Sequence, residues 1–246
     1  MARFMKSVPM IKYRLHRYFG SSHPVIPVIV TICFLRFIYS VRPMSIGTGA
    51  VLSGVFQFIM MTFIALSMNG SEETVEEQLL VFHGRNWRVY STARETAFFL
   101  ISVFYAALHI LGPIVVNACN DFSFFLTPMT AMDVVKGAFV VLGSGLAGII
   151  IGDVLHPRIT GNRRAQLIGT VALMLLTIVK DALIAKCRAF LFLDTLLPCV
   201  MKPAHDLGNK ECLAFKPVLA FFFMMILYYF IVTIVKNLVL QRRKFS

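Results

Sequence analysis

Six long apolar stretches divide this chain and restrict it to a membrane-embedded, all-helical fold. They cover approximately residues 24–40, 49–68, 95–118, 132–155, 165–184 and 217–235. A transmembrane helix needs about 20 apolar residues, so six crossings use roughly half of the 246 residues. Because only short connections and tails remain, we predict one all-α transmembrane domain over 1–246, with six transmembrane helices.

Lysine and arginine alternate between crowded and sparse connections, and this alternation predicts the orientation. The crowded segments are 1–23 with five, 69–94 with three, 156–164 with three and 236–246 with four. Of the other connections, the first holds only Arg42 and 119–131 holds none. The last, 185–216, holds six when Lys180 at its edge is included. By the positive-inside rule, both termini and segment 69–94 are expected in the cytoplasm and 186–216 outside. The basic outer segment runs against the rule, and its length accounts for the exception. We therefore expect a multi-pass protein of the cell (plasma) membrane.

The net charge of +12 follows from the same distribution. It indicates contact with anionic lipid at the cytoplasmic face rather than with nucleic acid, since no base-stacking module accompanies it. Residues 1–23 combine basic and apolar side chains, which favours an amphipathic helix lying in the membrane interface. Pro9 is expected near its start or as an interruption. A disordered basic tail and a mitochondrial targeting segment are the alternatives.

A glycine pattern in the fourth stretch matches the spelling of a nucleotide-binding turn. Gly143-x-Gly145-x-x-Gly148 has that spacing, but apolar sequence continues beyond it, and no strand–helix–strand unit surrounds it. The better interpretation is a membrane helix with a small-residue stripe, Ser144, Gly148 and Gly152, which permits close approach of a neighbouring helix.

Segment 69–94 has the pattern of a short helix beside the membrane. Glu76 and Glu77 fall in a first helical turn, where the helix dipole favours acids. Trp87 has the position of an interfacial anchor. The segment is either a solvated loop with an aromatic anchor or a docking surface for another protein.

Several common sites are missing from the sequence. There is no G-x-x-x-x-G-K-[ST] phosphate loop and no H-E-x-x-H pair, so neither ATP binding of that kind nor a zinc site is expected on this chain. The five cysteines lack metal-ligand spacing. Cys199 and Cys212 share the outer segment, where a disulfide is possible, while free thiols are the simpler expectation.

The chain resembles the membrane-spanning permease of an ABC-2 type exporter. The resemblance rests on the basic segment 3–18, the six spans with cytoplasmic ends, the acidic-to-basic stretch 72–94 and the long outer segment 186–216. It implies a coupling helix after the second span that docks on a separate ATPase, and short re-entrant outer helices between spans five and six. The residues expected to be most exposed on the coupling surface are Glu76, Glu77, Arg85, Trp87 and Arg88.

The resemblance also implies the partners of this chain. They are two copies of an ABC ATPase, which would bind ATP and Mg²⁺, and a second permease that is the same or homologous. The chain itself would be neither an enzyme nor a cofactor carrier. Its substrate would be amphipathic or hydrophobic, with a peptide favoured, and would pass along spans one, two and five.

A different class of function is an integral-membrane enzyme that acts on lipid or peptide at the interface. Its candidate groups are Asp153, His156 and Arg158 at the cytoplasmic end of span four, or Asp194, His205 and Asp206 outside, because paired carboxylates and histidines perform acid–base chemistry. A non-transporting immunity or assembly protein is a third possibility.

Overall fold

The computed structural model of the chain describes residues 2–71, 74–84, 86–207 and 212–242. Within these residues the chain is helical, and the β-structure is limited to one isolated bridge between Met44 and Phe125. Five helices are long and apolar enough to cross a membrane: α3 (Ile46–Ser71), α5 (Trp87–Ala118), α6 (Ala131–Val154), α8 (Arg163–Lys186) and α11 (Phe215–Arg242). The expectation of an all-α membrane protein is therefore confirmed.

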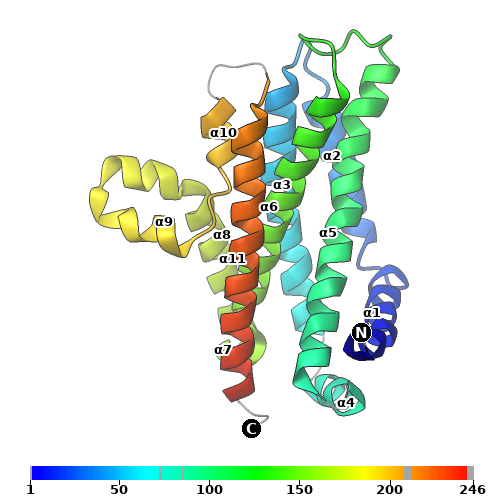
Figure 1. Cartoon of the computed structure of the whole chain (residues 1–246), viewed down its shortest axis with the longest axis vertical. Coiled ribbons are helices and arrows are strands. Elements are labelled where there is room, and N and C mark those ends of the chain that lie inside the picture. Colours follow the sequence, from blue (N-terminus) through cyan, green and yellow to red (C-terminus); the bar gives the residue numbers. More distant parts are fainter. Residues whose placement is uncertain (1, 72–73, 85, 208–211, 243–246) are drawn as a thin grey trace.

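The long helices form one upright bundle, and both termini lie toward the same end of it (Figure 1). Helices α4 (Thr74–Gly84) and α7 (Pro157–Thr160) lie at that end, which we call the α4 end. The connections 39–45 and 119–130 lie at the other, which we call the opposite end. Because both termini lie at the same end, the chain runs along the bundle an even number of times when α2 is counted as one pass.

The first predicted span is shorter than the others. Helix α2 covers only Val25–Ile38, 14 residues, which at 1.5 Å per residue is about 21 Å, against a hydrocarbon core of about 30 Å. Pro24 and Pro27 lie at its start and limit its extension toward α1. Its status as a sixth complete crossing stays a prediction.

Helices α3 and α6 form the centre of the bundle, and glycines set how closely they approach. A Cβ atom on Gly148 would come within 2.3 Å of the Phe58 carbonyl oxygen, and one on Gly152 within 2.3 Å of the Thr62 carbonyl oxygen. Only residues without a side chain permit this contact. The pattern Gly143-x-Gly145-x-x-Gly148 lies inside uninterrupted helix, so it forms no phosphate-binding turn.

The N-terminal helix α1 (Ala2–Phe19) packs against α5 and α4. Its buried side chains, at Ser7, Met10, Ile11, Arg14 and Tyr18, recur every three or four residues and so form one helical face. The expected break at Pro9 is wrong, since the helix continues through this residue.

The segment predicted as 69–94 divides differently from expectation. It contains the end of α3, the whole of α4 and the first two turns of α5, which begins at Trp87 with Asn86 as its cap. The Asn86 side-chain oxygen accepts a hydrogen bond from the Arg88 backbone N–H at 2.9 Å, so the residues from Trp87 onward belong to a long helix and not to the short helix expected in this segment.

In the described residues of the segment expected outside, 186–216, there are three short helices: η1 (Arg188–Leu191), α9 (Phe192–Leu196) and α10 (Lys202–Leu207). The loop of chain around α9 projects sideways from the bundle (Figure 1). All five cysteines are free thiols, so Cys199 and Cys212 are not bonded to each other.

Candidate functional site

Helix α4 is attached to the bundle by ion pairs on its inner side. The Glu77 carboxylate pairs with the Arg158 guanidinium of α7, and both side chains are largely buried. Glu76 pairs with Arg17 of α1 and also accepts a hydrogen bond from the Tyr13 hydroxyl at 2.9 Å. Leu80 adds an apolar contact to the cluster formed by α1 and α5. These contacts fix the rotation of α4 about its own axis.

The outer side of α4 carries an unpartnered apolar stripe. Val75, Leu79 and Phe82 are 64%, 54% and 79% exposed. Their spacing of four and three residues places them on one helical face, away from Glu77 and Leu80. Helix α4 lies at the end of the bundle (Figure 1), and the exposure of these side chains shows that this face is not packed against the other described helices. An exposed apolar patch of this kind is typical of a surface that contacts another protein or the membrane.

The structure thus reverses part of the expected coupling surface. The expectation that Glu77 is exposed is wrong, because the residue is buried at 4% exposure. Glu76 is partly buried by its contacts with α1. Trp87 is also partly buried, with the Arg158 guanidinium carbon 5.2 Å from its ring centroid. Arg88 is exposed as expected, and Arg85 lies outside the described residues.

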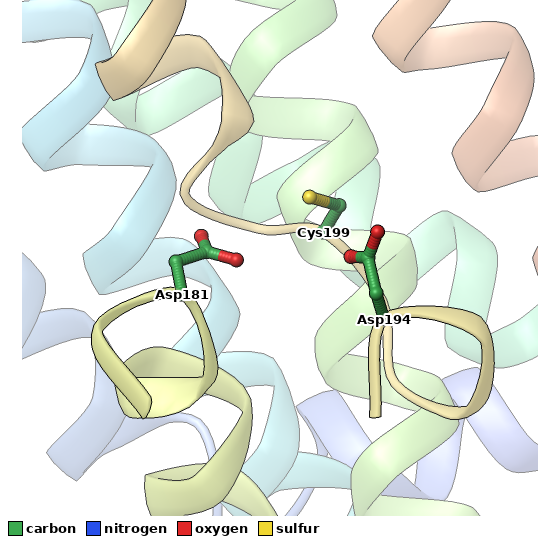
Figure 2. Close-up of side chains that lie close together, drawn as sticks. All are labelled: Asp181, Asp194 and Cys199. Carbon is green, nitrogen blue, oxygen red and sulfur yellow. The ribbon is translucent and has the colours of Figure 1, made fainter. Parts of the chain in front are cut away.

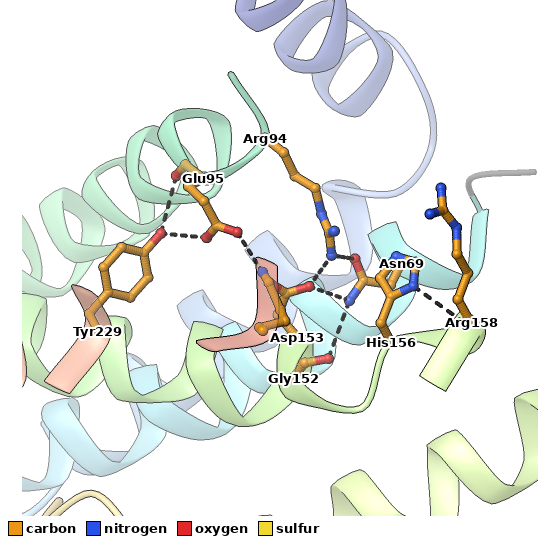
Figure 3. A network of polar contacts seen from close by, with 9 residues as sticks. Asn69, Arg94, Glu95, Gly152, Asp153, His156, Arg158 and Tyr229 are labelled. Atoms are coloured by element: carbon orange, nitrogen blue, oxygen red, sulfur yellow. Dashed lines mark hydrogen bonds and ion pairs between the residues drawn. The ribbon is translucent and has the colours of Figure 1, made fainter. Parts of the chain in front are cut away.

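A second cluster of polar side chains lies within the bundle near the α4 end (Figure 3). It connects α3, α5, α6 and α11. One oxygen of Asp153 on α6 accepts from Arg94 on α5 and, at 2.9 Å, from Asn69 on α3. The other oxygen accepts from Lys236 on α11. Arg94 also donates to the Asn69 side-chain oxygen at 2.7 Å.

Glu95 extends this group toward α11. It accepts from Lys236 at 2.5 Å and from the Tyr229 hydroxyl at 2.7 Å. We call Asn69, Arg94, Glu95, Asp153, Tyr229 and Lys236 the core network. Its two acids and two bases balance in charge, as buried ionic groups require. Losing one of its four charged members would leave an uncompensated buried charge, which costs about 3–5 kcal/mol.

The core network also bears on the enzyme alternative. Both oxygens of Asp153 are held by cations, and the ring of His156, 5% exposed, accepts from the Arg158 backbone N–H at 3.3 Å. The Asp153 carboxylate and the His156 ring are thus both engaged by other groups of the chain. Of the outer set, Asp194 pairs with Lys180, and His205 contacts Asp181 at 3.2 Å, so Asp181 lies between the two.

Asp181, Asp194 and Cys199 bring three potential metal-ligand atoms within 4.8 Å of one another (Figure 2). The Lys180 ammonium, which is fully buried, already donates to Asp194 at 2.9 Å and to the Leu197 carbonyl at 3.1 Å. Burial also raises the pKa of the Cys199 thiol, which disfavours the thiolate that binds metals. The lysine therefore supplies the cation that this cluster needs.

The sequence analysis missed the core network, although a signal was present. Asp153 and Lys236 are ionisable residues at the ends of long apolar helices, and such residues commonly pair with one another across a bundle. Asp153 lies 59 residues from Arg94 and 83 residues from Lys236 in the sequence. No local sequence pattern reveals contacts over such separations. Ser144, Gly148 and Gly152 lie at the α3–α6 crossing described above.

The chain was compared with protein-family models, with curated proteins and with solved structures, and none of these matches it.

Proposed function

We propose that this chain is the permease subunit of an ATP-driven ABC exporter and that α4 is its contact with a separate ATPase. The observation that carries the proposal is the exposed stripe Val75, Leu79 and Phe82 on a helix whose opposite side is fixed by ion pairs. A firmly held helix with an apolar outer face is a suitable means of passing force between a partner and a membrane bundle.

The contacts behind α4 support this role. Its Glu77 joins it to α7 through Arg158, and α7 directly follows α6, which carries Asp153 of the core network. A displacement of α4 by a partner would therefore be transmitted to α6, and through Asp153 to α5 and α11. In this proposal these contacts form the route between α4 and the core network.

The segment between α8 and α11 supports the expected re-entrant arrangement. The Tyr228 hydroxyl, near the middle of α11, donates to the Leu196 carbonyl at the end of α9. The chain thus returns to the depth of the bundle's middle before α10 leads back toward the opposite end. In this proposal the segment closes the outer side of the path, and a second permease completes it.

Co-purification tests the proposal. The full-length tagged chain would be isolated from its native membranes in mild detergent, and Mg-ATP hydrolysis in the eluate measured. We expect hydrolysis together with a phosphate-loop subunit in a one-to-one ratio to the chain. An eluate in which the chain transports its substrate without any ATPase would refute the proposal.

The orientation can be tested independently with a membrane-impermeant maleimide. Cys119 is exposed in the connection at the opposite end, and His83 is exposed on α4. We expect Cys119, as the only cysteine left, to react in intact cells. A cysteine-free chain with His83→Cys should react only after permeabilisation. The reverse result would place α4 outside and exclude its contact with a cytoplasmic ATPase.

A further inference from the structure

A cleft of about 470 Å³ lies between α2, α3 and α8 at the α4 end of the bundle. Ser67 of α3, Arg163 of α8 and the 20–24 connection lie at this end, since Arg163 begins α8 and Ser67 is near the end of α3. Met60 and Phe63 line the cleft one to two helical turns further toward the middle. The inner wall is otherwise apolar, with Ile26, Pro27, Ile64, Leu66 and Leu167.

The side chains that give the cleft its charge are basic. Arg163 and His23 line it, and no acidic residue does so among the described residues. The Arg163 guanidinium lies against the end of α3, where a Cβ on Gly70 would be 3.1 Å from its Nη2 atom. In the described part of the chain, no carboxylate forms an ion pair with Arg163. Among the described residues, the guanidinium in the cleft therefore has no acidic partner.

A buried amide adds an independent sign of a ligand. Gln166, one turn along α8 from Arg163, lines the same cleft and is only 1% exposed. Its Nε2 atom has no hydrogen-bond partner among the described residues. A buried donor without an acceptor costs about 1–3 kcal/mol, and an anionic oxygen bound in the cleft would remove that cost.

We propose that this cleft binds an anionic phospholipid from the adjacent leaflet, with its phosphate near Arg163 and Gln166 and an acyl chain along Met60 and Phe63. This assignment rests on the order of the groups along the cleft. The Arg163 cation and the Gln166 amide donor lie at the interfacial end, and an apolar surface continues from them toward the middle of the bundle. A peptide would also present backbone groups along its length, and the inner wall offers few polar partners for them. If the chain is an exporter, this lipid defines the class of amphiphile that it captures. Binding itself does not require the ATPase.

Native mass spectrometry of the purified full-length chain tests the site. Dioleoyl phosphatidylglycerol and dioleoyl phosphatidylcholine would be titrated separately, so that the acyl chains and the phosphate are shared and only the terminal headgroup differs. We expect the anionic lipid to bind about tenfold more tightly, or about 1.4 kcal/mol, because the choline group of the other lipid offsets the phosphate charge that attracts Arg163. Arg163→Gln should abolish that preference, and Gln166→Leu should weaken it without changing the charge of the chain.

Arg164→Gln is the matched control, because Arg164 is the next residue, equally charged and exposed, and does not line the cleft. It should bind the anionic lipid as the unaltered chain does. Arg163→Lys should restore part of the preference. Equal binding of the two lipids, or equal losses in the Arg163 and Arg164 variants, would overturn the proposal. Absence of an ATPase partner would refute the exporter assignment and leave this result intact.

Discussion

At the α4 end of the bundle, α6 lies directly against the backbone of α3 at Gly148 and Gly152, whereas toward the opposite end Gly137 has room for a methyl group. The same contrast holds for charges. The α4 half buries the core network, in which Lys236 pairs with two largely buried acids. In the other half Lys180 pairs with Asp194, whose side chain is 58% exposed.

This difference indicates which half moves as a unit. Close backbone packing and mutually satisfied buried charges resist rearrangement, since any displacement exposes a charge without its partner. Room beside Gly137 and a Lys180–Asp194 pair whose acid is exposed to water allow local opening. In the exporter proposal the α4 half transmits force as one body, and the opposite half opens to release the substrate.

The largest predicted effect concerns Lys236. Lys236→Met leaves Asp153 with one cation and Glu95 with only a hydroxyl donor, so we expect a loss of about 3–5 kcal/mol in the free energy of unfolding. Equilibrium unfolding in mixed detergent micelles measures it. The double variant with Glu95→Gln restores the charge balance and should recover part of the loss. A single variant as stable as the unaltered chain would show that the network contributes little.

The next effect concerns the α3–α6 crossing. Gly148→Ala places a methyl group against the Phe58 carbonyl and pushes the helices apart, which should cost about 2 kcal/mol by the same assay. Gly137→Ala, in the same helix, meets only the Ala50 Cβ at 3.7 Å. It should be neutral, or stabilising by about 0.5–1 kcal/mol, because alanine favours helix. Equal costs at both positions would remove the distinction between the two halves.

A smaller effect is expected at Lys180. Lys180→Met removes an equally buried lysine, but its acidic partner is exposed and is rehydrated when the lysine is lost. The global cost should be on the order of 1 kcal/mol. The main consequence should be local, namely faster amide exchange in 188–201 with unchanged exchange in α6. A global loss as large as that of Lys236→Met would contradict the looser attachment of this segment.

The sequence predicted the fold to the extent that local patterns determine it. The apolar stretches located the five long helices within a few residues at most ends, although α5 begins eight residues before its predicted span and α11 continues seven residues beyond its own. The stretch at 24–40 did not reveal how short α2 is, because apolar residues beyond Ile38, such as Tyr39 and Val41, belong to the connection.

The candidate site was less accessible to prediction, and α4 shows the reason. Acids at the start of a helix have the same sequence pattern whether they face water or a buried arginine. The rotation of α4 depends on Arg17 and Arg158, 59 and 81 residues away from their acidic partners in sequence. Sequence therefore placed a short helix here and did not reveal that its apolar side faces outward.

The measurement that tests the central claim most directly compares two phenylalanines of similar exposure. Phe82 on α4 is 79% exposed, and Phe122 in the opposite-end connection is 74% exposed. Neither Phe82→Ser nor Phe122→Ser should change the free energy of unfolding by more than about 0.5 kcal/mol. With each variant isolated from native membranes, we predict that Phe82→Ser loses the co-purifying ATP hydrolysis and Phe122→Ser retains it. Retention of full ATP hydrolysis by Phe82→Ser would contradict the assignment of α4 as the docking helix.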